Sequence, residues 1–118
     1  MDHQINLNYL REVTGGDKDI MIEMIDIFLS ETETVLSSIQ ECYNDGNWSQ
    51  LASEVHKLKP TLMYVGLSEV HGIAESLEQN AKSGNQIDMY EHWVDQIRSG
   101  FETIKPQLAA EKAKLEAS

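Results

Sequence analysis

Apolar residues recur every three or four positions in five segments of this chain, which is the spacing of one face of an α-helix. Turn-forming residues separate these segments, which run over residues 7–13, 18–43, 48–65, 68–82 and 87–108. None of the segments alternates apolar and polar residues with the two-residue period of a strand. We therefore predict an all-α fold, in which the four long segments form an antiparallel four-helix bundle and the short first helix caps one end.

The segment boundaries carry signals of their own. Asp17 and Asn47 each follow a glycine-containing turn and precede a long apolar pattern, so both are expected to be N-caps. Pro106 lies inside the last segment and should kink that helix or end its packed part. Residues 109–118 are helix formers without a sustained apolar seam, so we expect them to fray or to extend the last helix beyond the bundle. The last segment has the most regular pattern, with steps of three and four through Ile87, Tyr90, Val94, Ile97, Phe101, Ile104 and Leu108.

Length and composition limit the possible functions. A chain of 118 residues has room for one domain, residues 1–118, with a core over residues 7–108. A net charge of −11 argues against nucleic acid as a partner, because the phosphate backbone would be repelled. No apolar run approaches the roughly 20 residues of a membrane span, and the N-terminus lacks the pattern of a secretion signal. We expect a cytoplasmic monomer that does not bind membranes, and its single cysteine, Cys42, rules out an internal disulfide.

The familiar patterns of enzyme and cofactor sites do not occur in the sequence. No two histidines have the i, i+4 spacing of a helical metal site, and the doublet Gly15-Gly16 lacks the lysine and hydroxyl residue of a phosphate loop. The acidic residues are scattered over helix surfaces and form no acid–base pair. His3, His71 and His92 are interpreted as surface histidines without a function. We expect no metal, no cofactor and no kinase activity.

His56 differs from the other histidines in its surroundings. It lies more than a quarter turn from the centre of the apolar stripe of its segment, so its ring should stand at the exposed flank of the helix. Ser49, Ala52 and Ser53, one and two turns earlier, are small and leave the ring open. Lys59, at i+3, lies on the same side and can place its ammonium beside the imidazole.

The distribution of charge also singles out this position. Residues 1–55 carry eleven acidic and two basic side chains, whereas residues 56–118 carry nine and seven. Lys57 and Lys59 are the first basic residues after a base-free stretch over residues 19–56. A neutral imidazole has a nucleophilic nitrogen near pH 7, and a nearby lysine would offset the charge of an acquired phosphoryl group. On spacing alone, a surface histidine without a function stays an open alternative.

The residues around His56 resemble a known family. The stretch GNWSQLASEVHKLKP at residues 46–60, then Gly66, then the pair Leu77-Glu78, is similar to the histidine-containing phosphotransfer (HPt) domain. The Thr-Gly-Gly-Asp turn at residues 14–17 and the pair Phe28-Leu29 in the next helix also fit this family. The resemblance extends over residues 7–105.

The resemblance implies a phosphorelay carrier. His56 would accept a phosphoryl group from the aspartate of a receiver domain and pass it to another receiver domain, and Lys59 would be the charge partner of that group. Response-regulator receiver domains or a hybrid sensor kinase would be the partners. Gly66 would end the helix or allow close packing, and Leu77 would pack against the same helix. Glu78 would either hydrogen-bond locally near the site or be a solvated charge, and the solvated charge is the favoured interpretation. The docking face would include Ser49, Ala52, Ser53, Lys57, Pro60 and Met63.

Pro60 departs from the family pattern, which has glycine four residues after the histidine. Proline removes the hydrogen bond to the His56 carbonyl, which costs about 3 kcal/mol in an undistorted helix. We therefore expect a local kink that begins at His56, with that carbonyl turned to solvent or to Lys57 or Lys59. If Pro60 has disabled the site, the alternative function is that of a helical adaptor that binds a partner without being phosphorylated.

Overall fold

The computed structural model describes residues 4–118, and every regular element in them is helical. The elements in chain order are α1 (Asn8–Thr14), α2 (Lys18–Asp45), α3 (Trp48–Tyr64), α4 (Ser68–Ser83), the 3-10 turn η1 (Ile87–Met89) and α5 (Tyr90–Ala117). The predicted all-α fold is confirmed, and the predicted boundaries agree with these to within two residues, except that the last helix begins three residues later and ends nine residues later than predicted.

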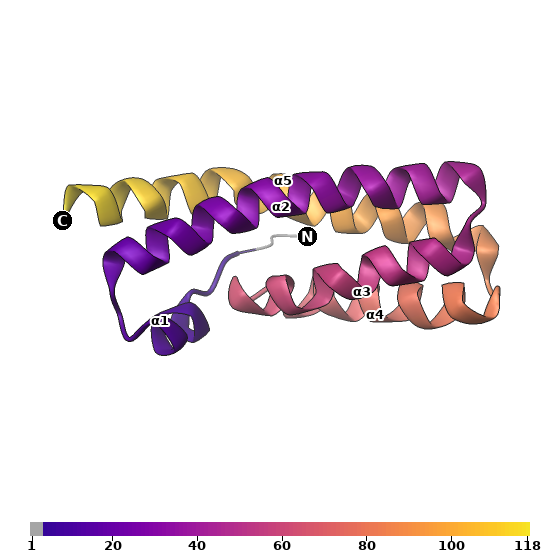
Figure 1. Cartoon of the computed structure of the whole chain (residues 1–118), viewed down its shortest axis with the longest axis horizontal. Coiled ribbons are helices and arrows are strands. Elements are labelled where there is room, and N and C mark those ends of the chain that lie inside the picture. Colours follow the sequence, from indigo (N-terminus) through magenta and orange to yellow (C-terminus); the bar gives the residue numbers. More distant parts are fainter. Residues whose placement is uncertain (1–3) are drawn as a thin grey trace.

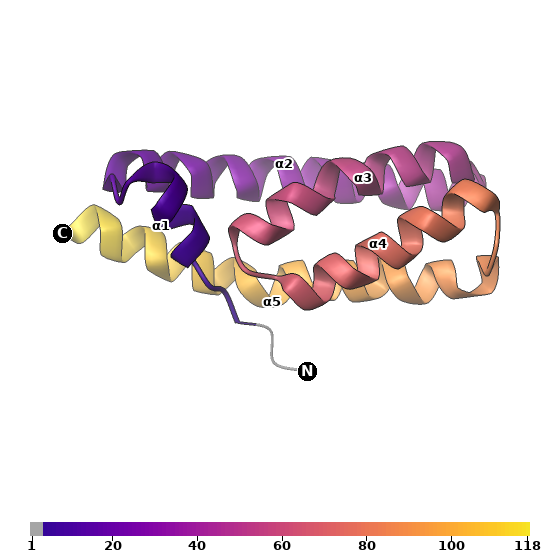
Figure 2. The same ribbon diagram turned by 90° about the horizontal axis from the view of Figure 1, so that it is seen from below.

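Helices α2 to α5 form the four-helix bundle, which measures 48 × 24 × 20 Å (Figure 1). The two long helices, α2 and α5, extend beyond the shorter pair α3 and α4. In both views α1 lies at the end of the bundle where α2 begins and α5 ends (Figure 1, Figure 2). The expected cap at one end is therefore present, and it covers the overhang that α3 and α4 leave open.

Both predicted N-caps are confirmed. The Asp17 carboxylate accepts a hydrogen bond from the Ile20 amide at 3.1 Å, and the Asn47 side chain accepts one from the Gln50 amide at 3.2 Å. Each bond satisfies one of the amides that the first turn of a helix leaves without a partner. The second cap starts α3 at Trp48 and so fixes which face of that helix carries His56.

The core follows the predicted apolar stripes. In α5 the predicted positions from Tyr90 to Leu108 are all buried. Ile87 is the exception, since it lies in η1 and its side chain is 44% exposed. The three-residue step from Ile87 to Tyr90 fits the helical pattern, but the backbone at Ile87 forms a 3-10 turn and not an α-helix. Among the described residues, no helix is long and apolar enough to cross a membrane.

The end of α5 corrects one expectation. Helix α5 continues through Pro106, and Leu108 behind it is fully buried, so the proline does not end the packed part. The other expected effect of Pro106, a kink, stays a prediction. Residues beyond 108 extend the helix: Lys112 pairs with Asp26 of α2 at 2.7 Å, and Leu115 packs partly against the core. The first turns of α2, which extend beyond α3 and α4, are the packing partner of this tail. The sequence of the tail alone did not predict that contact.

Gly66 combines the two roles considered for it. Its φ of +77° is left-handed. The Gly66 amide donates a hydrogen bond to the Met63 carbonyl at 3.1 Å, and the Leu67 amide donates one to the Leu62 carbonyl at 2.9 Å, which is the pattern of a Schellman C-terminal motif. A Cβ at this position would lie 2.5 Å from the Cβ of Asn6. Gly66 therefore ends α3 and also lets the N-terminal segment pass closely over the α3–α4 turn.

Candidate functional site

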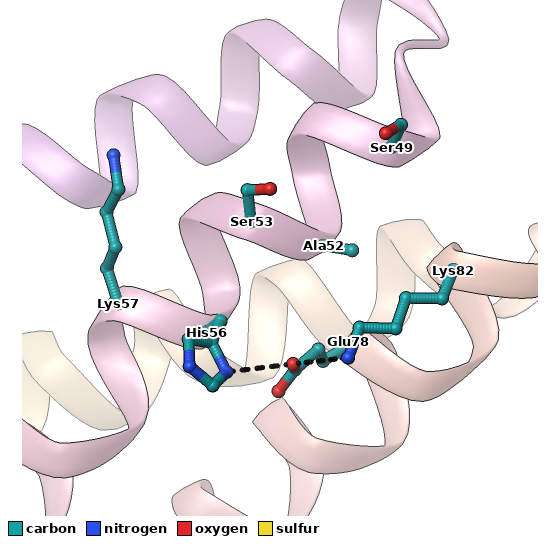
Figure 3. A pocket seen from close by; sticks show the side chains of 7 residues that line it. All are labelled: Ser49, Ala52, Ser53, His56, Lys57, Glu78 and Lys82. Carbon is teal, nitrogen blue, oxygen red and sulfur yellow. Dashed lines mark hydrogen bonds and ion pairs between the residues drawn. The ribbon is translucent and has the colours of Figure 1, made fainter.

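His56 stands on the exposed face of α3, where its side chain is 69% exposed. The ring borders an open cavity of about 550 Å³ between α3 and α4 (Figure 3). The residues that line this cavity are Ser49, Ala52, Ser53, His56, Lys57, Glu78 and Lys82. The predicted exposure of the ring, and its setting among small side chains, are confirmed.

Glu78 forms the hydrogen bond near the site that was one of its two interpretations, and the favoured interpretation as a solvated charge is wrong. Its side chain is only 4% exposed, and it lies on α4 directly opposite His56. Oxygen Oε2 lies 2.9 Å from Nδ1 of His56 and 3.1 Å from Nζ of Lys82, and oxygen Oε1 lies 2.6 Å from Nζ of Lys59. A buried carboxylate is tolerated because three nitrogen donors surround it.

These partners decide the protonation state of Glu78. Burial raises the pKa of its carboxyl, but the hydrogen bonds from Lys59, Lys82 and His56 and the charge of Lys59 outweigh burial and lower the pKa to about 2. Glu78 is therefore ionised at neutral pH. An ionised carboxylate can only accept hydrogen bonds.

The ionised carboxylate fixes the tautomer of His56. Because Oε2 accepts, Nδ1 must carry the proton and donate it. In the neutral ring the lone pair is then on Nε2, the nitrogen that points away from Glu78 (Figure 3). The site thus presents one defined nucleophilic nitrogen to the open side of α3.

The three lysines of the site differ in what they contact. Lys57 extends away from the ring and pairs with Glu54 at 3.1 Å (Figure 3). Lys59 is only 18% exposed, and its ammonium reaches the site through Glu78, on the opposite oxygen from the histidine. Lys82 is 65% exposed, and its ammonium shares Oε2 with the ring nitrogen. The structure therefore brings Lys59 into the site but does not place it at the cavity.

The predicted docking residues divide into two groups. Ser49 and Ser53 are exposed at the cavity, and Ala52 is buried at 3% exposure beneath it. Pro60 and Met63 do not line the cavity, although both are exposed on the same helix one and two turns after His56. Leu77 is fully buried, as predicted for a residue that packs in the core.

Helix α3 continues through Pro60 and ends at Tyr64. The proline therefore does not interrupt the helix that carries His56. The kink expected to begin at His56 stays a prediction.

Of the other histidines, His92 is exposed as interpreted, His71 is half-buried, and His3 lies outside the described residues. Within residues 4–118, no group of three or more histidine, cysteine, aspartate or glutamate side chains could hold a metal ion.

The comparisons with known proteins agree with this geometry. Residues 23–111 match the family described as the Hpt domain. The chain belongs to the Hpt domain family. Hpt domains are histidine phosphotransfer carriers of phosphorelays, and this is the coarse function of the chain. No curated protein sequence matches the chain significantly.

A solved structure shows the same fold. The crystal structure of histidine-containing phosphotransfer protein B (HptB) from Pseudomonas aeruginosa PAO1 superposes with a TM-score of 0.85. The superposition covers 94% of this chain and 96% of that chain at 18% sequence identity. At this identity the likeness shows that the two proteins share the Hpt bundle fold.

Two residues of this Hpt site were missed or misread in the sequence. Glu78 lies next to the stripe of α4, four residues after buried Ala74 and three before buried Ala81, so it faces the neighbouring helix. Lys82 lies four residues after Glu78, at ion-pair spacing on the same face. The spacing therefore held a signal for both residues, although it did not show which helix they face.

The depressed pKa of Glu78 predicts a pH-dependent stability difference. Glu78→Gln should lower the free energy of unfolding by about 1–3 kcal/mol at pH 7, because Lys59 loses its carboxylate. A folded pKa of about 2, below the ordinary 4.5, gives stability that is present above pH 4.5 and is lost as the pH falls toward 2. The difference in the free energy of unfolding between the wild type and Glu78→Gln, measured by urea unfolding, should therefore narrow between pH 5 and pH 2. Glu75→Gln, an exposed position on the same helix, is the control, and a difference that stays constant with pH would contradict the assignment.

Proposed function

We propose that this Hpt domain carries the phosphoryl group on Nε2 of His56, accepting it from the phosphoaspartate of one receiver domain and passing it to the aspartate of another. The observation that carries the proposal is the hydrogen bond from Nδ1 of His56 to the buried carboxylate of Glu78. This bond leaves the nucleophilic lone pair on the exposed nitrogen.

In the proposed step, the lone pair of Nε2 attacks the phosphorus of the aspartyl phosphate. The N–P bond forms, the P–O bond to the aspartate breaks, and the released carboxylate keeps the electron pair. Nδ1 keeps its proton throughout, so the ring becomes positively charged. Glu78, 2.9 Å from Nδ1, stabilises that charge. Transfer to the second receiver domain is the same step in reverse.

The other residues serve this step in different ways. Lys59 is proposed to act on the phosphoryl group indirectly, as the charge partner of Glu78, because its ammonium holds the carboxylate that orients the ring. Exposed Ser49, Ser53, Pro60 and Met63 are proposed as part of the docking face, since they lie along the helix on both sides of His56. Small side chains near the ring leave room for the loops that surround a receiver aspartate.

The test is transfer from a receiver domain. A receiver domain encoded in the same genome is phosphorylated with radiolabelled acetyl phosphate, separated from the reagent and mixed with the chain. We expect up to one phosphoryl group per chain to move, and the label to be lost in acid but to survive base. Acetyl phosphate without a receiver domain is the control. If none of the receiver domains transfers its label, the chain is a helical adaptor and the proposal is wrong.

A further inference from the structure

Lys82 has a position in the site that neither other lysine has. Lys82 both lines the cavity and contacts Glu78. Its ammonium and Nδ1 of His56 contact the same carboxylate oxygen, Oε2. Figure 3 shows the Lys82 side chain reaching from α4 along the cavity to this carboxylate. The ammonium therefore lies beside the ring that would carry the phosphoryl group.

The contacts of Glu78 make Lys82 the cation that can leave. Lys59 is largely buried and holds Oε1 at 2.6 Å, so its departure would leave a buried carboxylate without its closest partner. Lys82 is 65% exposed and holds Oε2 at 3.1 Å, an oxygen that the histidine also satisfies. An exposed i, i+4 pair contributes little stability, and the four-carbon stem of lysine turns easily.

Charge balance gives a reason for Lys82 to move. Before transfer, Glu78 is the anion that Lys82 contacts. After transfer, the phosphoryl group brings nearly two negative charges to the cavity side, and the ring takes a positive charge that Glu78 then neutralises. The phosphoryl oxygens become the stronger acceptor for an exposed ammonium.

Resting on the proposed function, we propose that Lys82 is the direct cation of the phosphoryl group: its ammonium exchanges Glu78 for the phosphoryl oxygens as the group arrives on His56. Lys59 stays on Glu78 throughout. The site then has a fixed cation behind the carboxylate and a movable cation at the cavity.

The test compares three lysine variants at two positions. Lys82→Met should accept the phosphoryl group from a phosphorylated receiver domain at least about tenfold more slowly in single-turnover kinetics. Lys82→Arg should restore most of the rate. Lys114→Met is the matched control, since Lys114 is also an exposed helical lysine paired with a glutamate of its own helix, Glu111 at 3.4 Å, but does not line the cavity, and it should stay within about twofold of the wild type.

A second measurement separates a direct contact from a structural effect. The wild type and Lys82→Met are phosphorylated with phosphoramidate, and the ³¹P resonance of the phosphohistidine is titrated. Loss of an adjacent cation should raise the pKa of the phosphoryl group by at least about half a pH unit in Lys82→Met. A variant that is merely less well folded would not show this shift.

The outcomes distinguish the two proposals. If the wild type is labelled by neither a receiver domain nor phosphoramidate, the proposed function is wrong. If the wild type is labelled but Lys82→Met has the wild-type rate and phosphoryl pKa, only the role of Lys82 is wrong. Equal slowing by Lys114→Met and Lys82→Met would also contradict that role, because it would indicate a general effect of positive charge on the encounter with the partner and not a contact at the cavity.

Discussion

Replacing His56 with glutamine is expected to abolish phosphorylation by a receiver domain: the transferred label should fall at least about a hundredfold, to below the detection limit. Glutamine has no nucleophilic nitrogen, because its amide lone pair is delocalised. Its amide group can still donate a hydrogen bond to Glu78, so the cluster of Glu78 with Lys59 and Lys82 keeps a donor in place of the ring. The measurement is transfer of radiolabel from a phosphorylated receiver domain, followed by the acid and base stability of the label.

Two comparisons make this result specific. His92→Gln removes an exposed histidine on α5, away from the cavity, and should be labelled like the wild type. The free energy of unfolding of His56→Gln should lie within about 1 kcal/mol of the wild type, because the substituted ring is exposed. Labelling of His56→Gln at the wild-type level would show that another residue accepts the phosphoryl group.

The position of the phosphoryl group on the ring tests the role of Glu78 independently. Because Nδ1 donates to an ionised carboxylate, phosphorylation should occur at Nε2 alone. The two phosphohistidine isomers can be separated after alkaline hydrolysis of the labelled protein. A product phosphorylated on Nδ1 would show that the hydrogen bond to Glu78 does not persist during the reaction.

The helices could be predicted from the sequence because burial in a bundle repeats with the period of the helix itself. Positions such as Tyr90 and Phe101 are buried because they lie on the face of α5 that points into the bundle, and predicting this needs no knowledge of which helices they meet. Periodicity alone did not predict the exposure of Ile87 or the packing of the tail beyond Leu108. The first lies where the backbone changes to a 3-10 turn, and the second packs because α2 is as long as α5.

The candidate site was predictable to the extent that it lies on one helix. Exposure of His56 and the small side chains before it follow from the register of α3 alone. The role of Glu78 does not, since its charge is compensated by Lys59 and His56 from α3 and by Lys82 from its own helix. The spacing within α4 indicates the pair of Glu78 with Lys82, but the contacts with Lys59 and His56 depend on how α3 and α4 pack, which a pattern within one helix does not contain.

The same limit applies to Gly66, whose substitution by alanine is expected to destabilise the protein by about 3–4 kcal/mol. Alanine at a φ of +77° costs about 1–2 kcal/mol by itself. Its Cβ would also lie 2.5 Å from the Cβ of Asn6 and 2.8 Å from the Asn6 carbonyl oxygen, so the N-terminal segment must move. That movement would break the hydrogen bond from the Asn6 amide to the Val65 carbonyl and expose buried Leu7.

Gly84→Ala is the matched control for this prediction. Gly84 follows α4 with a φ of +70°, and a Cβ there meets no atom within 4 Å. The two substitutions therefore share the backbone strain, and only Gly66→Ala adds the collision with Asn6. Urea unfolding of both variants should give a difference of about 2 kcal/mol. Equal costs would mean that the N-terminal segment contributes little to stability at the α3–α4 turn, and that Gly66 matters only because it ends the helix that carries His56.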